Sequence, residues 1–456
     1  MATSSVTMEL LPDDVLVMVM QFLDVADVLA CRLVCKRLCG LALHPDVWRH
    51  RSLSDDEPCA SAVLRLAPCL NKLIVTGQVS TLAVTTTRCA VKKMILLATH
   101  TKATDQMALM ATEYAYAVYK QESLGRLRHL ELCQMYHLHM PVTDVLLRTV
   151  ASCSDLKSLV FNSELPVTST RVVHGPSRSS LTYFHCPFGE SSASFLLTIL
   201  AGHAATLEEI SIGSDLDFEE TGTADLLAAM PRLRFLKCED SLRGFEVVAE
   251  CKTLRRVHIC LFGDHDEFDG LPKFLRRAKQ LRRVHLENIR PISAEYSTAL
   301  FEALTSPGRS HLERLTLEGF EDVRPLFHAK TSLSHLRYLS VRLEFIDDEM
   351  LLSITPVTAP ALETLELRCR EKCRHALIHR DAVKATLAAN TSLHIQIFYG
   401  TRSKCEPQDC TVCAGGCHPA VEWAKVFRIG LFSHDPDKCP SLEAHTDDTE
   451  CSWIHM

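Results

Sequence analysis

The segments LRRVHICLF at residues 254–262 and LRRVHLENI at residues 281–289 begin 27 residues apart and share one apolar pattern. The pattern is Leu-x-x-Leu-x-Leu, with Val, Ile, Phe, Met or Cys in some of the leucine positions. Clear further copies start at Leu127, Leu156, Leu207, Leu312, Leu336 and Leu362; weaker ones start at Leu70, Val91, Leu181, Leu233 and Leu393. Recurrence over most of the chain predicts an array of similar structural repeats.

The intervals between the cassettes carry helical patterns, as in SASFLLTILAGHA at residues 192–204. Each repeat is therefore expected to be a short strand followed by a helix, as in leucine-rich repeats, whose period is roughly 20–29 residues. The pattern predicts that residues 70–400 form an α/β fold. This fold is a curved leucine-rich-repeat solenoid of about 12–13 repeats. Its parallel strands lie on the inside and its helices on the outside.

The side chains that alternate with the buried leucines of a strand point away from the core and are available to a target. These positions are basic in the centre of the array. An acidic or phosphorylated segment of a protein would suit them, because arginine binds carboxylates and phosphates in a bidentate manner. The alternative is an ordinary polar surface whose charges pair with Glu287 and Glu318. The candidate target-binding residues are Tyr183, Phe235, Arg256, His258, Arg283, His285, Arg314 and Tyr338.

The segment MELLPDDVLVMVMQFLDVADVLACRLVCKRLCGLALHPDVWRH at residues 8–50 predicts three short helices separated by turns that contain aspartate. Val15, Leu16, Val19 and Phe22 form an apolar stripe on the first of them. About forty residues do not easily bury three apolar helices, so this bundle is expected to leave an apolar surface for a partner.

The same segment resembles the F-box in its Leu11-Pro12 opening, in the helix that ends at Phe22, in the run LVCKR at residues 33–37 and in Trp48. The resemblance implies a three-helix F-box over residues 8–52 that binds a Skp-type adaptor, which in turn binds a cullin scaffold. Leu38 stands where the family usually has an aromatic residue, which leaves the local packing in doubt. The adaptor-binding residues implied are Leu11, Pro12, Val15, Leu16, Val34, Cys35 and Trp48.

Without that resemblance, the residues allow another interpretation. The amino-terminal helices would then form a cap that turns the same apolar residues inward against the repeats. Residues 53–69 are interpreted as a linker and the helix of the first repeat.

The carboxy-terminal region, residues 401–432, is rich in cysteine and is interpreted as a cap for the last repeat. Cys405, Cys410, Cys413 and Cys417 are spaced closely enough to bind one tetrahedral zinc ion, so they are a candidate structural zinc site. Reduced thiols within the cap, and a redox-active or disulfide-linked cluster, are the alternatives. We predict an amphipathic helix from Pro419 to Phe432 and a flexible acidic tail at residues 433–456.

Composition sets limits on the partners. The 456 residues carry a formal net charge of −7, with no global excess of basic residues, and this disfavours nucleic acid. The apolar run at residues 15–23 is too short for a membrane span or signal peptide. We therefore expect a chain of the cytoplasm, the nucleus or both, with no membrane partner and with mostly reduced cysteines.

No catalytic motif accompanies these features, since a phosphate-binding glycine loop, a Gly-x-Ser-x-Gly turn and a His-Glu-x-x-His pair are all absent from the sequence. The resemblance implies a non-catalytic substrate-recognition subunit of an SCF-type E3 ubiquitin ligase, which holds a protein target for ubiquitination and requires no cofactor. Two alternatives stay open: an F-box scaffold or inhibitor outside a ligase, and a receptor that needs a polyanion bound at Arg256 and Arg283.

Overall fold

The computed structural model describes residues 11–77, 81–98, 104–135, 143–163, 175–186, 193–213, 222–239, 244–262, 270–308, 311–328, 333–369, 374–399, 428–435, 439 and 451–456. The chain divides into two compact units near residue 230. The first unit consists of Met1–Leu226 and Met230–Arg232, and the second of Leu227–Ala229 and Leu233–Met456.

Four short helices open the first unit: α1 (Asp13–Phe22), α2 (Val25–Cys31), α3 (Lys36–Leu41) and α4 (Pro45–Trp48). Their ends follow the local sequence. The side chain of Asp24 caps α2 by accepting a hydrogen bond from the amide of Asp27 at 2.8 Å, and Pro45 lies in the first turn of α4, where no amide hydrogen is needed. Helix α1 packs against α3 and α4.

Strands and helices then alternate through the rest of the first unit, and its strands lie side by side in chain order with parallel pairing. The elements are β1 (Ser52–Ser54), α5 (Ala60–Leu66), β2 (Cys69–Val75), α6 (Thr81–Thr86), β3 (Ala90–Leu97), α7 (Thr104–Ser123), β4 (His129–Cys133), α8 (Thr143–Ser152), β5 (Ser158–Phe161), β6 (Tyr183–Cys186), α9 (Ala193–His203), β7 (Glu209–Ile212) and α10 (Thr223–Ala229), at which the units divide.

The sheet begins earlier than the cassettes predict, because β1 lies in the segment that we interpreted as linker and helix. Asp55, which follows β1, is fully buried. Its carboxylate accepts hydrogen bonds from the amide of Thr76 at 2.9 Å, from the hydroxyl of Thr76 at 2.7 Å and from the amide of Gly77 at 3.2 Å. These bonds join the ends of β1 and β2, so the helical bundle runs directly into the sheet.

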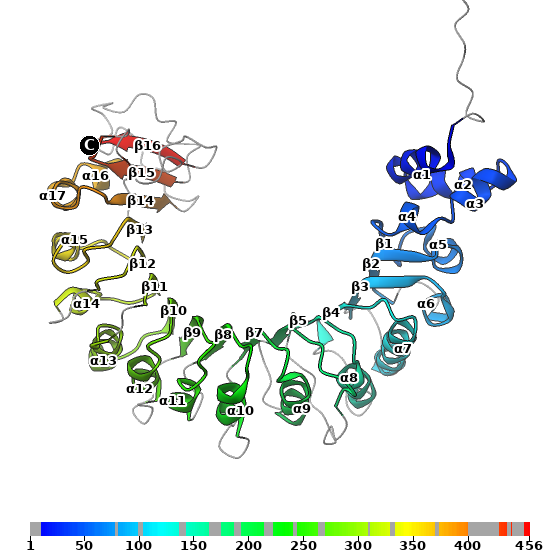
Figure 1. Ribbon diagram of the computed structural model, residues 1–456, viewed down its shortest axis with the longest axis horizontal. Coiled ribbons are helices and arrows are strands. Elements are labelled where there is room, and N and C mark those ends of the chain that lie inside the picture. The colour runs from blue at the N-terminus through cyan, green and yellow to red at the C-terminus, as the bar shows by residue number, and fades with distance from the viewer. Residues whose placement is uncertain are drawn as a thin grey trace, which may run out of the picture. The chain divides into compact units, whose positions relative to one another are not determined.

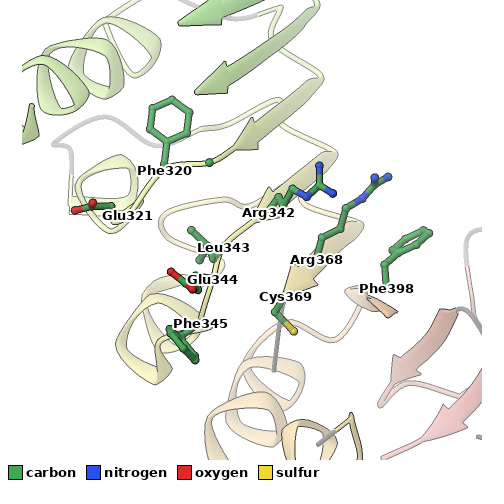
Figure 2. A pocket seen from close by; sticks show the side chains of 10 residues that line it. Phe320, Glu321, Arg342, Leu343, Glu344, Phe345, Arg368, Cys369 and Phe398 are labelled. Atoms are coloured by element: carbon green, nitrogen blue, oxygen red, sulfur yellow. The ribbon is translucent and has the colours of Figure 1, made fainter. Parts of the chain in front are cut away.

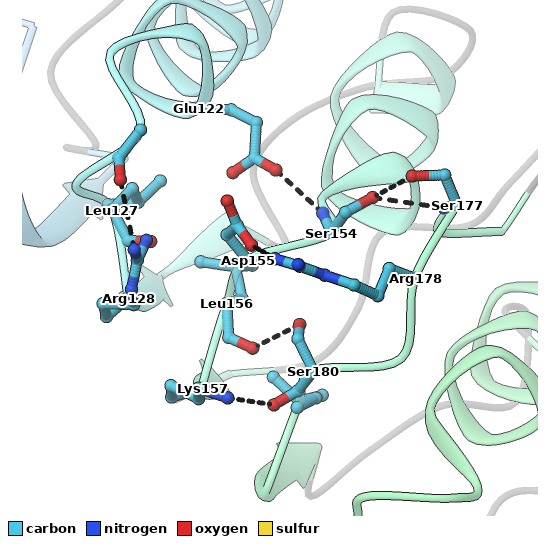
Figure 3. Close-up of polar contacts among 12 residues, drawn as sticks. Glu122, Leu127, Arg128, Ser154, Asp155, Leu156, Lys157, Ser177, Arg178 and Ser180 are labelled. Carbon is cyan, nitrogen blue, oxygen red and sulfur yellow. Dashed lines mark hydrogen bonds and ion pairs between the residues drawn. The ribbon is translucent and has the colours of Figure 1, made fainter.

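Within the first unit, polar side chains also connect the turns that precede successive strands (Figure 3). Glu122 accepts a hydrogen bond from the amide of Ser154 at 2.8 Å, and the hydroxyl of Ser154 lies 2.8 Å from that of Ser177. Asp155 pairs with Arg178 in the next turn. Each turn is therefore held by its neighbour, as expected when repeats are stabilised by contacts with adjacent repeats.

The second unit continues the alternation, and its strands β8 to β14 are parallel. The elements are β8 (Phe235–Glu239), α11 (Phe245–Val248), β9 (Arg256–Phe262), α12 (Gly270–Arg277), β10 (Arg283–Arg290), α13 (Ala294–Leu304), β11 (Arg314–Glu318), α14 (Pro325–His328), β12 (Tyr338–Arg342), α15 (Asp348–Ser353), β13 (Thr364–Cys369), α16 (Arg374–Ile378), α17 (Asp381–Ala389), β14 (His394–Tyr399), β15 (Arg428–Phe432) and β16 (Cys451–His455).

The cassette leucines form the core of each unit. In β10, for example, Val284 and Leu286 are buried whereas Arg283, His285 and Glu287 face away from the core. Helices cover the face of the strands that carries the buried residues (Figure 1). The predicted α/β fold with parallel strands and outer helices is confirmed.

The carboxy-terminal predictions were wrong at two points. Residues 428–432, expected as the end of a helix, form strand β15, which pairs antiparallel with β14. Residues 451–455, expected in a flexible tail, form β16, which pairs parallel with β15. The physical reason is that an edge strand such as β14 exposes unpaired backbone groups, which further strands satisfy.

No helix in the described ranges combines the length and the apolar character needed to cross a lipid bilayer.

Candidate functional site

Trp48 is the centre of the amino-terminal helical bundle. Its side chain is fully buried, and its indole nitrogen donates a hydrogen bond to the carbonyl of Ala42 at 2.6 Å. Arg51 lies 5.7 Å from the centroid of the Trp48 ring and donates to the carbonyl oxygens of Met20 at 2.6 Å and of Val47 at 2.7 Å. One aromatic residue and one guanidinium thus join α1 to α4.

A large apolar surface remains outside this core. Phe22 is 89% exposed at the end of α1, and Leu33 and Val34, which connect α2 to α3, are 86% and 69% exposed. Met18 and Val19 on α1 are about half exposed as well. Monomeric proteins rarely expose this many large apolar side chains in so short a segment, so the surface marks an interaction site.

The seven predicted adaptor-binding residues do not all reach that surface. Pro12, Val34 and Cys35 are exposed, and Leu11 and Val15 are half-buried. Leu16 and Trp48 are buried in the core of the bundle, so their assignment to direct adaptor contacts was wrong. Both residues hold the bundle together instead.

Sequence reasoning missed Phe22, Leu33 and Met18 as surface residues, although one signal was available. Residues 15–20 of α1 are apolar without interruption, VLVMVM. A short helix that is apolar on all sides buries one face in its own domain and needs a second partner for the other. Helical spacing alone assigned Val15, Leu16, Val19 and Phe22 to one stripe and left Met18 out of it.

The family model described as F-box-like matches residues 8–54. The amino-terminal domain is F-box-like. No curated protein matches the chain. Among solved structures, the crystal structure of the Rad7 and Elc1 complex from yeast has a chain that is 15% identical, with a TM-score of 0.39 over 79% of this chain and 90% of that one.

A second candidate surface lies on the second unit, on the face of the strands that the helices leave open. The hydrogen-bond register places Arg256, Arg283 and Arg314 side by side on β9, β10 and β11. We call these three residues the arginine row. Phe235 and Tyr338 flank the row on β8 and β12. The arrangement therefore brings five of the eight predicted target-binding residues into one line.

Aromatic rings support the two ends of the arginine row. The guanidinium of Arg256 lies 5.0 Å from the centroid of the Phe235 ring, and that of Arg314 lies 5.1 Å from the Tyr338 ring. Arg283 in the middle is exposed and forms no ion pair with the described residues. Stacking orients the outer guanidinium planes, and the exposed Arg283 between them carries a charge that is accessible to an anion.

Two residues further along the same strands, His258 and His285 form a different arrangement. Their rings stack at 3.9 Å between centroids with an interplanar angle of 14°. Nε2 of His258 lies 2.9 Å from Glu287, and Nε2 of His285 lies 3.5 Å from Glu318. We call these four residues the histidine–glutamate ladder. Glu287 and Glu318, which the sequence offers as partners of the basic centre, thus lie beside the two histidines.

Burial keeps these histidines neutral. It lowers the pKa of His258 to about 4, and the nearby His285 and Lys237 act in the same direction. It also lowers the pKa of His285. Burial alone would raise the pKa of Glu287, but the hydrogen bond from His258 keeps it below the ordinary value. The ladder is consequently a neutral stack beside carboxylates at pH 7, and the positive charge of this surface comes from the arginine row.

The ladder predicts that stability is lost in mild acid. In the unfolded chain His258 takes up a proton below its ordinary pKa of 6.5, whereas the folded chain takes it up only near pH 4, so stability is complete above pH 6.5 and falls as the pH drops toward 4. We expect the free energy of unfolding of His258→Gln to fall between pH 7.5 and pH 4.5 by on the order of 2 kcal/mol less than that of the wild type, after allowance for solvent screening. Urea denaturation at the two pH values measures this difference.

The exposed His311 supplies the control for this experiment, because His311→Gln is expected to leave the acid-induced loss unchanged. An equally steep loss in the His258→Gln variant would contradict the proposed protonation.

A hollow of about 810 Å³ lies at the carboxyl ends of β11 to β14 in the same unit. Arg342 and Arg368 extend side by side at its edge on neighbouring strands, with Phe398 beyond them (Figure 2). The two guanidiniums are paired, Arg342 with Glu318 at 2.8 Å and Arg368 with Glu366 at 2.7 Å. An anionic group would therefore have to compete with carboxylates here, whereas Arg283 forms no ion pair with the described residues.

Gly319 also borders this hollow, and only glycine fits there. Its φ of +77° is in the left-handed region, and a Cβ would collide with the carbonyl oxygen of Asn288. The backbone of Gly319 thus turns sharply after β11 and leaves space at the strand ends.

The remaining predicted sites are placed differently. Tyr183 lies half-buried on β6 of the first unit, where burial raises its pKa, and it is not part of the second unit's surface. Cys405, Cys410, Cys413 and Cys417 lie outside the described residues. The zinc prediction for these four cysteines therefore stays a prediction.

Proposed function

We propose that this chain is a substrate-recognition subunit of an SCF-type E3 ubiquitin ligase. The F-box-like domain binds a Skp-type adaptor, the adaptor binds the cullin scaffold, and the repeats, which we take to be leucine-rich repeats, bind a protein target. The chain contributes proximity between target and ubiquitin-transferring enzyme and performs no chemistry itself. We place it in the cytoplasm, the nucleus or both.

The observation that carries this proposal is the exposed apolar surface of the F-box-like domain. Phe22, Leu33 and Val34 fall within the matched residues 8–54, and each exposes more than two thirds of its side chain. Covering such side chains contributes roughly 1.5–3 kcal/mol each. A partner that buries all three gains this free energy toward the cost of association, whereas the free domain leaves the side chains in water.

The arginine row supports a target with an acidic or phosphorylated segment. The three arginines occupy paired positions on adjacent strands, whose backbones are about 4.8 Å apart, so their guanidiniums share one face on which carboxylates or phosphates of an extended peptide can bind. Phe235 and Tyr338 at the ends offer apolar contact beside the charges.

Reversing charge in the row should therefore weaken target binding. We expect Arg283→Glu, Arg314→Glu to lower the affinity for acidic and phosphorylated peptides at least ~10-fold and to reduce its dependence on salt. Binding of the purified chain to a peptide array at two salt concentrations measures both. A matched control is Arg276→Glu, Arg277→Glu on α12, which makes the same charge change on the helical side. Equal losses in the two variants would argue against the row.

The proposed function is tested by co-expression of the full chain with a Skp-type adaptor and a cullin, followed by size-exclusion chromatography. Co-elution of all three is the expected result. Co-elution with the adaptor but without the cullin would favour a scaffold or inhibitor that acts outside a ligase. No complex with the adaptor would overturn the proposal and leave a helical cap on a repeat protein.

A second candidate, a receptor that needs a bound polyanion, is favoured by the same arginine row, since Arg283 has no carboxylate partner among the described residues. Native mass spectrometry of the purified chain distinguishes the two. A retained polyanion that the Arg283→Glu, Arg314→Glu variant lacks would support the second candidate, and a chain of bare mass would remove it.

A further inference from the structure

We propose that His394, His434 and Cys439 form a zinc-binding site at the carboxy-terminal end of the second unit. His394 begins strand β14, His434 follows strand β15, and Cys439 lies a few residues further on. One ligand atom from each of the three side chains lies within 4.8 Å of the other two. Two imidazoles and a thiolate are a donor set that zinc prefers.

The spacing of His394 and Cys439 fits a common metal ion. Zn–N and Zn–S bonds of about 2.05 and 2.3 Å at a tetrahedral angle place nitrogen and sulfur about 3.6 Å apart. Sγ of Cys439 lies 3.4 Å from Nε2 of His394. A small adjustment would bring both atoms into contact with one ion.

His394 is already held in the form that binds metal through Nε2. Its Nδ1 lies 3.1 Å from the carbonyl oxygen of Glu363, which can only accept, so Nδ1 carries the hydrogen and Nε2 keeps its lone pair. A metal-binding histidine almost always has such a partner for its second nitrogen, which fixes the orientation of the ring. His394 and Cys439 are both more than 90% buried, so the ion would be shielded from water on that side.

When zinc binds, these three residues release at most one proton. Each imidazole binds through an unprotonated nitrogen, and the thiol of Cys439 releases its proton to solvent as the sulfur–zinc bond forms. The fourth position of a tetrahedral ion is filled by water or by another ligand.

The location gives the site a structural role. Because β14 and β15 are antiparallel, the start of β14 at His394 and the residue His434 after β15 lie at the same end of the strand pair, with ring centroids 4.8 Å apart. Zinc would join β14 to the segment after β15 at the place where the parallel order of the sheet ends. The junction of β14 and β15 is thereby held by a metal as well as by backbone hydrogen bonds.

A second cluster, His258, Cys260 and Glu287, has similar spacing but fits less well. Nε2 of His258 is the atom that donates to Glu287, and both lie on the open face of the strands. Burial also raises the pKa of Cys260 to about 12, which opposes formation of the thiolate. We therefore assign zinc to the carboxy-terminal cluster.

This assignment is tested by measuring the zinc content of the full chain. The chain is purified without a polyhistidine tag and without added metal. We expect one zinc ion per chain by inductively coupled plasma mass spectrometry. Cys439→Ser and His434→Gln are each expected to weaken zinc binding at least ~100-fold, and His434, which is only partly buried, serves if a change at a buried position prevents folding. Cobalt substitution should add thiolate-to-cobalt absorption that Cys439→Ser abolishes.

Two controls make the result specific. Cys451→Ser changes a buried cysteine on the neighbouring strand and should leave the zinc content unchanged. A variant with serine at Cys405, Cys410, Cys413 and Cys417 examines the cysteine cluster that the sequence suggests. A chain without zinc, or one whose zinc is lost only in that fourfold variant, would overturn the assignment.

Discussion

Phe22→Asp, Leu33→Asp is expected to weaken binding of a Skp-type adaptor at least ~100-fold. Both side chains are almost fully exposed in the free domain, so the folded state does not depend on them. In the complex each would be buried, and a carboxylate at either position would have to lose its water without a partner. Isothermal titration calorimetry with purified adaptor measures the change.

Val357 offers a matched control for that double change, because it is 81% exposed but lies in the second unit. Val357→Asp should leave adaptor binding within about twofold of the wild type, since surface substitutions away from an interface have small effects. Undiminished binding by the double variant would show that the adaptor uses another surface.

Trp48→Ala is expected to destabilise the F-box-like domain by about 3–5 kcal/mol. The change removes a fully buried aromatic ring, leaves a cavity between α1 and α4, and deprives the carbonyl of Ala42 of its hydrogen bond. Small domains have little stability to spare, so unfolding of these helices is expected with loss of adaptor binding. Hydrogen exchange of residues 13–48, compared with that of the second unit, measures the local effect.

Trp48→Phe is a milder change, because it keeps one aromatic ring and removes the donor to Ala42 together with the second ring of the indole. A smaller loss of about 1–2 kcal/mol is expected. Phe345→Ala, at a side chain that is 71% exposed in the second unit, should change stability by less than about 0.5 kcal/mol. Normal hydrogen-exchange protection of α1 and α4 in Trp48→Ala would contradict the assignment of Trp48 to the core.

Sequence resemblance and tertiary position disagree at Leu16 and Trp48. The F-box resemblance identified both as characteristic residues and implied adaptor contacts, whereas both are buried. A motif records which residues a domain needs and does not separate those that fold it from those that bind. Phe22 belongs to the same apolar run but lies at the end of α1, where its side chain is 89% exposed.

The exposed rows of the second unit were more predictable. The third and fifth residues of each cassette were expected to face away from the core, and Arg283 and His285 do so. The partners of these side chains were less predictable. Arg256 and Arg314 stack on aromatic rings of neighbouring strands, whereas His258 and His285 stack on each other. Partner choice depends on register between strands about 30 residues apart, which no local pattern encodes.

The sequence by itself determined the strand–helix repeat, the direction of each strand's side chains and the F-box-like segment, because these follow from short-range apolar spacing. Only the tertiary structure decided which residues of that segment stay exposed and that the parallel order of the strands ends at the antiparallel β15. It also decided that His394 meets Cys439 across 45 residues. Such contacts form when distant segments complete an open sheet edge, and the free energy of that closure depends on the whole fold.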